Sequence, residues 1–127
     1  TVNLSYKVRY EEREEYLFAH ISGPESVHNA INFFKELRAK GDAEGYGAFL
    51  VVDEVSGKLD TNDTFHISKE IAKLHIGNTI AFVDPKEETF AANAFGGTVV
   101  ANRGVITRVF DNESDAVDWL KETIKRG

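Results

Sequence analysis

The sequence predicts an α/β fold: a mixed, mostly parallel sheet with an N-terminal antiparallel hairpin and about four helices. Three observations carry this prediction. Short apolar runs typical of strands alternate with longer segments whose apolar residues recur at helical spacing. Strands that alternate with helices pair in parallel through right-handed crossovers. The length of 127 residues suits one domain, so residues 1–127 are expected to form a single unit.

An antiparallel hairpin is expected at the start of the chain. The charged run at residues 11–15 forms its turn, and residues 16–21 form its second strand. In the first strand apolar residues alternate with polar ones, and this period of two is typical of a half-buried strand. The alternating apolar residues are Leu4, Tyr6, Val8 and Tyr10.

The first helix is predicted over residues 24–40, where apolar residues recur at helical spacing. Pro24 near its start and Gly41 just past its end stand where these residues are favoured at helix ends. A continuous apolar run at residues 49–52 then predicts a strand that is covered on both faces. A polar loop from residue 53 to about residue 61 follows it.

The second helix is predicted over residues 62–74, and a further buried strand is predicted over residues 79–83. Asp84, Pro85 and Glu87 then form a helix-start signal. Asp84 would be the N-cap, Pro85 the first helical residue, and Glu87 stands three residues after the cap. This signal indicates a short third helix.

The end of the chain is expected to add strands and a closing helix. Gly96 and Gly97 are predicted to stop the third helix. A strand around residues 98–101 and a strand over residues 105–110 follow, either as one interrupted strand or as a hairpin. In the closing helix apolar residues share one face, which indicates that this helix docks on the sheet. These residues are Ala116, Trp119, Leu120 and Ile124.

Composition argues against several classes of protein. The formal net charge of -6 argues against a dedicated nucleic-acid binder, which needs a basic surface. No apolar run approaches the roughly 20 residues that span a bilayer, and no apolar signal stretch opens the chain. We therefore expect a cytoplasmic protein. The sequence contains no cysteine, which excludes disulfides and thiolate metal sites.

Four segments carry a resemblance to a known family. They are ISGPES after the hairpin, FLVVD and IAFVDP at two predicted strands, and RVFDNESDAVDWL near the end of the chain. With the order of elements, they resemble the SpoIIAA-like group of the STAS superfamily over almost the whole chain. The resemblance implies strands roughly in chain order and regulation by binding, as in the bacterial anti-sigma-factor antagonists of this superfamily.

The resemblance also implies a switch site. In the antagonists a serine in an Asp-Ser-Ser-Gly-like motif, at the start of the helix after the third strand, is phosphorylated by a partner kinase. Asp60 and Thr61 fall about where the aspartate and the acceptor hydroxyl of that motif lie. The helix start of this chain has neither the serine nor the glycine, so the chain resembles the uncharacterised members more than a working antagonist.

The loop and helix start after the apolar strand form the candidate interaction or phospho-switch site. Long polar loops are often functional, and a phosphate at a helix N-terminus meets free N–H groups. Hydroxyls such as that of Thr61 are also common N-caps, however, and nearby carboxylates would repel a phosphate. The candidate residues are Asp53, Ser56, Asp60, Thr61, Asp63 and Thr64.

Three aspartates, Asp53, Asp84 and Asp111, follow successive predicted strands. The carboxyl ends of parallel strands form the edge where ligands bind, and carboxylates gathered there could hold Mg²⁺. Asp84 and Asp111 also stand immediately before helices, where aspartate commonly caps the first N–H groups. Asp53 has no such explanation. We assign no metal site, because Mg²⁺ and Ca²⁺ demand more ligands than this.

Phenylalanines on the second and third helices are the second candidate site. Phe65, Phe90 and Phe95 are interpreted either as core packing or as the wall of an apolar pocket or partner surface. A pocket would suit a lipid-like ligand, because the CRAL-TRIO domains, whose architecture is related to the STAS fold, bind apolar ligands.

The sequence favours a non-enzymatic regulatory or protein-interaction module. The alternative is a carrier or sensor of a small apolar ligand, of CRAL-TRIO-like type. No set of nucleophiles stands near any of the four histidines, so a Ser-His-Asp arrangement is not supported. No phosphate loop or dinucleotide fingerprint is present, and no cofactor is predicted. The protein partner is not identified by the sequence, and association into a homodimer stays open.

Overall fold

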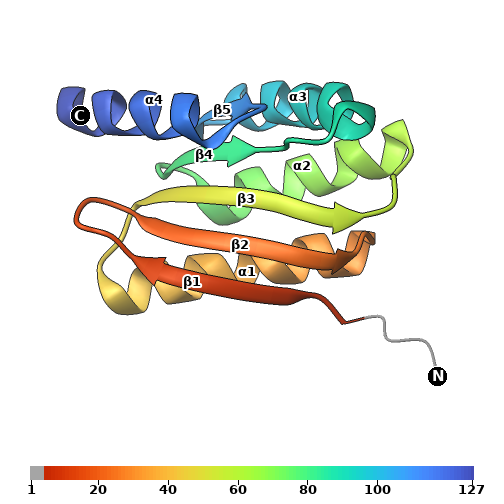
Figure 1. Ribbon diagram of the computed structural model, residues 1–127, viewed down its shortest axis with the longest axis horizontal. Helices are drawn as coiled ribbons and strands as arrows, with labels where there is room; N and C mark the ends of the chain where they lie inside the picture. The colour runs from red at the N-terminus through yellow and green to blue at the C-terminus, as the bar shows by residue number, and fades with distance from the viewer. Residues whose placement is uncertain (1–4) are drawn as a thin grey trace.

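The computed structural model describes residues 5–127, which fold into five strands and four helices (Figure 1). The predicted alternation at Leu4 lies outside these residues. The strands are β1 (Lys7–Glu12), β2 (Leu17–Pro24), β3 (Ala48–Ser56), β4 (Thr79–Val83) and β5 (Ile106–Phe110). The helices are α1 (Val27–Glu44), α2 (Thr61–His75), α3 (Glu87–Ala101) and α4 (Glu113–Arg126). None of these helices is long and apolar enough to cross a membrane.

The strands form one sheet in the order β1-β2-β3-β4-β5, which is also their order in the chain. β1 pairs antiparallel with β2, and every other neighbouring pair is parallel. This confirms the predicted mixed sheet with its opening hairpin and its parallel strands. Because β2 to β5 run in one direction, their carboxyl ends all lie at the same edge of the sheet.

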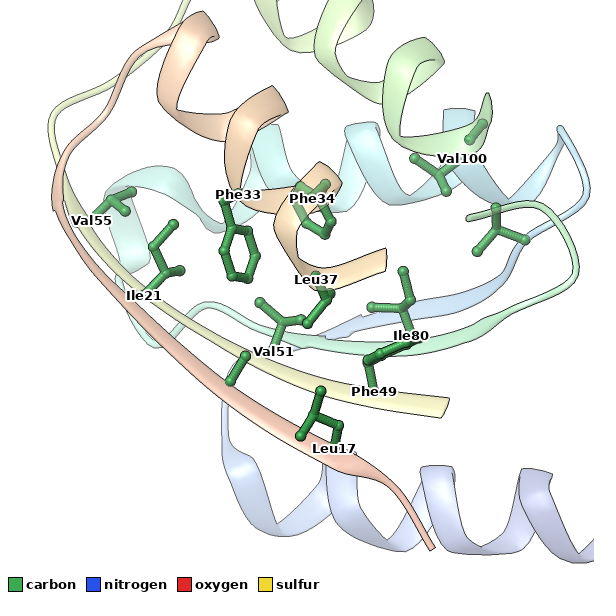
Figure 2. Close-up of a cluster of buried hydrophobic side chains, with 13 residues drawn as sticks. Leu17, Ile21, Phe33, Phe34, Leu37, Phe49, Val51, Val55, Ile80 and Val100 are labelled. Carbon is green, nitrogen blue, oxygen red and sulfur yellow. The ribbon is translucent and has the colours of Figure 1, made fainter. Parts of the chain in front are cut away.

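The two faces of the sheet bury separate clusters of apolar side chains. Phe49 and Val51 of β3 belong to the cluster under α1, α2 and α3, whereas Leu50 and Val52 belong to the cluster under α4. This alternation follows from the period of two along a strand. Figure 2 shows α1 and α4 on opposite sides of the strands. β3 is apolar in a continuous run because both of its faces are covered.

α3 continues through the two glycines that were predicted to stop it. The predicted strand at residues 98–101 is therefore wrong, because these residues form the end of α3. α3 packs closely on its neighbours at this point. A Cβ atom on Gly97 would lie 2.6 Å from Cγ2 of Val109 in β5, and one on Gly96 would lie 2.8 Å from Oγ of Ser68 in α2. The glycines allow close packing here and do not end the helix.

The boundaries of α1 also differ from the prediction. The helix begins after Ser26, whose side chain accepts a hydrogen bond from the backbone N–H of Asn29, while Pro24 still belongs to β2. Gly41 is buried within the helix instead of following it. The helix ends at Gly45, which has a φ of 81°, a left-handed conformation that glycine adopts without steric cost.

α2 ends on a buried histidine that joins three parts of the core. The His75 side chain is fully buried, and its Nε2 lies 2.9 Å from the backbone oxygen of Phe34 in α1. Its Nδ1 lies 3.0 Å from Nδ2 of Asn78, and its ring packs edge-on against Phe49 of β3. Burial lowers the pKa of His75, and the neutral ring can donate to Phe34 while accepting from Asn78.

Candidate functional site

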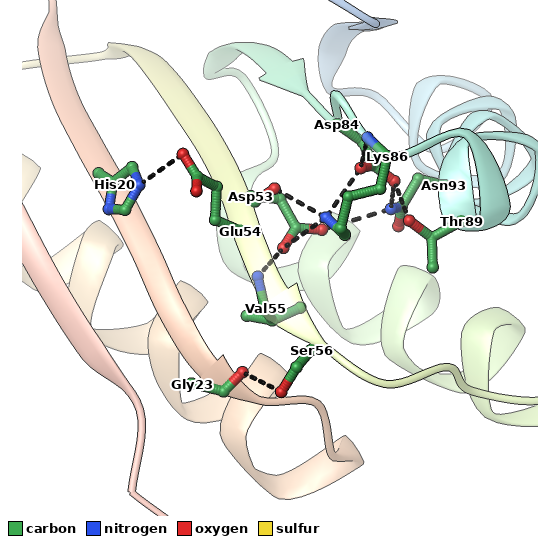
Figure 3. Close-up of polar contacts among 10 residues, drawn as sticks. All are labelled: His20, Gly23, Asp53, Glu54, Val55, Ser56, Asp84, Lys86, Thr89 and Asn93. Carbon is green, nitrogen blue, oxygen red and sulfur yellow. Dashed lines mark hydrogen bonds and ion pairs between the residues drawn. The ribbon is translucent and has the colours of Figure 1, made fainter.

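Four polar side chains meet at the carboxyl edge of the sheet, and we call them the edge cluster: Asp53, Asp84, Lys86 and Asn93 (Figure 3). Asp53 lies in β3, Asp84 follows β4, Lys86 precedes α3, and Asn93 lies on α3. The ammonium Nζ of Lys86 stands 2.8 Å from Oδ1 of Asp84 and 2.9 Å from the backbone oxygen of Asp53. Lys86 therefore ties the ends of two neighbouring strands together.

Asp84 is the hub of the edge cluster. It is fully buried, and its carboxylate accepts four hydrogen bonds. The donors are the backbone N–H and Nζ of Lys86, Oγ1 of Thr89 at 2.6 Å and Nδ2 of Asn93 at 2.6 Å. Burial opposes ionisation of this carboxyl, but the hydrogen bonds outweigh it and lower the pKa of Asp84. Asp84 is thus held as a carboxylate.

The Asp53 carboxylate is also buried but has weaker partners. Its Oδ1 accepts a hydrogen bond of 3.0 Å from the backbone N–H of Val55, and its Oδ2 accepts one of 3.3 Å from Asn93. Nζ of Lys86 lies 3.8 Å from its Oδ1, which is an ion pair without a hydrogen bond. Burial raises the pKa of Asp53, and these partners only partly offset that effect.

Glu25 adds a third carboxyl group at the same edge, directly after β2. Its backbone N–H donates to the backbone oxygen of Ser56 at 2.7 Å, which places it beside the end of β3. Burial and the nearby charge of Asp53 raise the pKa of Glu25 to about 7. Three carboxyl groups therefore share one ammonium group, that of Lys86.

A cavity of about 110 Å³ lies between the sheet and the three helices α1, α2 and α3. Its wall is mostly apolar, and Figure 2 shows several of its side chains, among them Phe33, Ile80 and Val100, pointing into the space between helices and sheet. Glu25 and Asp53 line one end. Both also line an adjoining cavity of about 30 Å³, which reaches the loop at residues 57–60.

The start of α2 presents the predicted switch residues to solvent. Asp60 is the N-cap, and its Oδ1 accepts a hydrogen bond of 2.7 Å from the backbone N–H of Asp63. Thr61 is the first residue of the helix and is exposed. Its hydroxyl forms no hydrogen bond with another residue of the described chain, so the interpretation of Thr61 as the N-cap is wrong. Thr64 donates from Oγ1 to the backbone oxygen of Asp60 at 2.9 Å.

The structure divides the six residues of the candidate switch site. Asp60, Thr61, Asp63 and Thr64 lie together at the helix start, whereas β3 extends further than predicted and includes Asp53 and Ser56. The polar loop is correspondingly shorter than the predicted one. Asp53 is buried in the edge cluster, and Ser56 donates from Oγ to the backbone oxygen of Gly23 at 3.3 Å.

The three candidate phenylalanines do not line the cavity. Phe65 is 38% exposed, and the cationic groups of Lys69 and Arg103 lie 4.7 and 5.5 Å from its ring centre. Phe95 is 44% exposed, and Phe90 is half-buried. Their helices do border the cavity, but through other residues, such as Ile67 of α2 and Val100 of α3.

Of the three aspartates that were predicted to follow strands, two come together. Asp53 and Asp84 share Lys86 and Asn93, while Asp111 is exposed. The predicted capping roles of Asp84 and Asp111 are wrong. Lys86 occupies the N-cap position of α3, and Asn112 caps α4 by accepting from the backbone N–H of Asp115 at 2.8 Å. Within residues 5–127 no three His, Cys, Asp or Glu side chains gather to hold a metal ion.

Three residues of this region were missed by the sequence analysis: Glu25, Lys86 and Asn93. A signal existed for the first two, because Glu25 directly follows β2, Lys86 lies three residues after the end of β4, and the carboxyl ends of parallel strands meet at one edge. Asn93 carried no such signal. It lies in the middle of α3, and its contact with Asp84 depends on how that helix is placed.

Two solved structures share this arrangement of elements. A variant of RsbS from Moorella thermoacetica is similar with a TM-score of 0.60 and 18% sequence identity, covering 94% of this chain and 98% of that chain. The NMR structure of protein TM1081 is similar with a TM-score of 0.54 and 19% identity, covering 93% and 88% of the two chains. The likeness confirms the STAS-type fold predicted from the sequence. The sequence matches neither a protein-family model nor a curated protein.

Proposed function

We propose that this chain is a non-enzymatic regulatory module that binds a protein partner through the start of α2. One observation carries the proposal: Asp60, Thr61 and Asn62 are all exposed. The side chains of Thr61 and Asn62 are bonded to no other residue within the described chain. The fold supports it, because the STAS superfamily that the sequence resembles includes regulatory anti-sigma-factor antagonists, and RsbS shares the fold. A polar, accessible surface of this kind suits recognition by a protein partner.

The charge of this surface favours a basic partner. Asp60 and Asp63 carry two carboxylates beside the free hydroxyl of Thr61, and the cap formed by Asp60 holds them in place. A phosphate on Thr61 would gain the helix dipole and suffer repulsion from both carboxylates. We infer that the carboxylates take the place of a phosphorylated state permanently. The partner would then recognise them with lysine or arginine side chains.

The edge cluster supports no catalytic role. A catalytic acid or base must reach a substrate proton. Both oxygens of Asp84 are occupied by donors from Lys86, Thr89 and Asn93. The arrangement instead resembles a structural tie between strands and helix.

The proposal is tested by partner capture with charge-neutral variants. Asp60→Asn/Asp63→Asn removes two charges and keeps a capping residue at position 60, because asparagine caps helices as well as aspartate does. Thr61→Ala removes the hydroxyl. Native cell extract is passed over each immobilised protein, and bound proteins are quantified by mass spectrometry. We expect the double variant to lose a partner that the wild type retains, by about tenfold or more.

The matched controls lie on the other face of the sheet. Asp115 and Ser114 occupy the first turn of α4, as Asp63 and Thr61 do in α2. Asp115→Asn and Ser114→Ala should therefore retain every partner of the wild type. Mass spectrometry of the native chain reports whether Thr61 is phosphorylated. Identical partners for all five proteins would move the interaction surface away from α2.

The alternative function, a carrier of a lipid-like ligand, has the cavity in its favour. Its volume of about 110 Å³ argues against a lipid. Typical ligand pockets enclose roughly 300–1,000 Å³, so a long acyl chain does not fit. A ligand of this chain must be small, which suits a sensor better than a lipid carrier.

A further inference from the structure

We propose that the cavity between the sheet and α1, α2 and α3 binds a small apolar molecule that carries a protonated amine. The apolar body would lie among the side chains of the cavity wall, and the amine would lie at the end formed by Glu25 and Asp53. The site borders the start of α2 through Thr64, but Asp60, Thr61 and Asp63 of the partner surface do not line it. Its test needs no protein partner, so either proposal can fail while the other stands.

The size of the cavity sets the size of the ligand. An engineered cavity of about 150 Å³ lined by apolar side chains in another protein holds one benzene molecule. The cavity of about 110 Å³ is of the same order, so one ring or a branched alkyl group fits it. The wall comes from every element that surrounds it, including Phe33 of α1, Ile67 of α2, Ile80 of β4 and Val100 of α3. A polar group buried among these side chains would lose its hydration without compensation.

The charge at the polar end sets the head group of the ligand. Glu25, Asp53 and Asp84 outnumber the cations beside them, because Nζ of Lys86 already donates to Asp84 and to the backbone of Asp53 and Lys58 is the other cation here among the described residues. An anionic head would add a fourth negative charge to this group. An ammonium head would offset the excess and form charge-assisted hydrogen bonds, which are the stronger kind. The arrangement therefore selects a cation.

Glu25 has the capacity to receive that ammonium group. Its carboxyl group accepts a backbone hydrogen bond from Ser26, while no side chain of residues 5–127 donates to it. It is half-buried and borders both the main cavity and the smaller adjoining one. Burial and the charge of Asp53 raise its pKa to about 7, and the charge of Lys86 offsets them only in part.

The test uses three ring compounds of nearly equal size that differ in charge: benzylamine, benzyl alcohol and benzoate. Each is titrated into the ¹⁵N-labelled chain at about pH 8, where a primary amine is still protonated and Glu25 is ionised. We expect saturable shifts of the backbone N–H signals of Ala30, Asn93 and Gly97, which line the cavity. Benzylamine should bind at least about tenfold more tightly than benzyl alcohol, and benzoate should bind more weakly than either.

Two variants locate the ligand. Glu25→Gln should weaken benzylamine by about tenfold and leave benzyl alcohol unchanged, because it removes only the charge. Ala30→Leu fills the cavity from α1 and should abolish the binding of both compounds. The control is Glu54→Gln. Glu54 follows Asp53 in β3 but pairs with His20 on the opposite face of the sheet, at 3.0 Å (Figure 3).

The affinity for benzylamine should also depend on pH. The charged groups that face Glu25 are Asp53 from β3, Asp84 and Lys86 from the segment between β4 and α3, and Lys58 from the neighbouring loop. Protonation of Glu25 below about pH 7 removes the charge that holds the amine, so affinity should fall as the pH is lowered from about 8 to about 5.5. Glu25→Gln should flatten this dependence.

Several results would overturn the proposal. The first is equal affinity for benzoate and benzylamine, because the cavity would then not select a cation. A second is an unchanged benzylamine titration in Ala30→Leu, which would place the ligand outside the cavity. A third is the absence of saturable shifts with all three compounds. Ala30→Leu is first checked by its own spectrum, and Glu25→Gln gives an independent answer if Ala30→Leu is unfolded.

Discussion

Neighbouring buried carboxyl groups in this protein have pKa values shifted in opposite directions because their hydrogen-bond donors differ. Asp84 and Asp53 are both buried, yet the pKa of Asp84 is lowered and that of Asp53 is raised. Asp84 has four donors, one of them the Lys86 ammonium group, whereas the donors to Asp53 are a backbone N–H and a distant amide. Where charge-assisted hydrogen bonds are lacking, desolvation determines the direction of the shift and raises the pKa of the carboxyl group.

Glu25 should make folding less stable as the pH rises. Its folded-state pKa of about 7 lies above its ordinary value of 4.5, so the folded chain holds this proton more tightly than the unfolded chain. The cost of ionising it appears above about pH 4.5 and is complete above about pH 7. Glu25→Gln should therefore be more stable than the wild type in urea unfolding at about pH 8 and similar at about pH 4. Glu54→Gln should show no such gain. An equal gain would show that the raised pKa of Glu25 is not the cause.

His75 should have the opposite effect. Burial lowers its folded-state pKa below the ordinary 6.5, so the folded chain resists protonation of this ring. Its contribution to stability is present above about pH 6.5 and is lost as the pH falls through the folded-state pKa. His75→Gln should be less stable than the wild type at about pH 7.5 and should lose less stability on acidification. The exposed His66, changed to Gln, is the control and should follow the wild type.

At the scale of elements, α3 shows how packing can override a local signal. Gly96 and Gly97 would end an isolated helix more often than continue it, because glycine has a low helix propensity. Here Gly97 faces Val109 of β5 and Gly96 faces Ser68 of α2. The absence of side chains lets α3 approach both elements. The close contacts between α3 and its neighbours offset the free energy that two glycines cost within a helix.

Gly97→Ala should destabilise the protein, although the same change stabilises an exposed helix by about 1 kcal/mol. The new Cβ would lie 2.6 Å from Cγ2 of Val109. We expect a loss of about 1–3 kcal/mol in the free energy of unfolding, the usual cost of overpacking. Val109→Ala removes the clashing methyl groups. The double variant should lose less stability than the sum of the losses of the two single variants. If the losses are simply additive, the clash with Val109 is not what destabilises Gly97→Ala.

α4 should be held to the sheet more by Leu120 than by Trp119. Leu120 is fully buried, whereas Trp119 is half-buried and packs on Phe110 with ring centres 5.7 Å apart. Leu120→Ala should cost about 3 kcal/mol and Trp119→Ala about 2 kcal/mol, because cost follows the buried volume removed. Guanidinium unfolding of both variants measures this order. A larger loss for Trp119→Ala would mean that its ring is more buried in solution.

At the scale of the whole molecule, the order of the strands places three helices on one face of the sheet and one helix on the other. Successive right-handed crossovers between neighbouring parallel strands put α1, α2 and α3 on one face. In the described part of the chain α4 alone packs on the other face. The cavity and the edge cluster therefore lie on the side with three helices. The opposite side depends on one helix that comes last in the chain.

Removal of α4 should abolish cooperative folding. A chain that ends at residue 111 would expose the apolar cluster that contains Leu50, Val83 and Phe18, and such a patch is not sustained by a soluble monomer. We expect a broad thermal transition and binding of the dye ANS, the signs of lost side-chain packing. A chain that lacks only residues 125–127 is the control and should unfold cooperatively. A sharp transition without α4 would show that the other face folds independently.

The sequence by itself determined the fold class, the parallel strands and most of the helices, because the spacing of apolar residues within a segment reports its period and its buried face. Only the tertiary structure decided the continuity of α3, the edge cluster and the cavity. The edge cluster and Glu25 come from β3, from α3 and from the residues that follow β2 and β4, so Glu25, Asp53, Asp84, Lys86 and Asn93 meet only when the strands are in register. The cavity is the space left after three helices pack on one face, and its volume depends on how closely they pack.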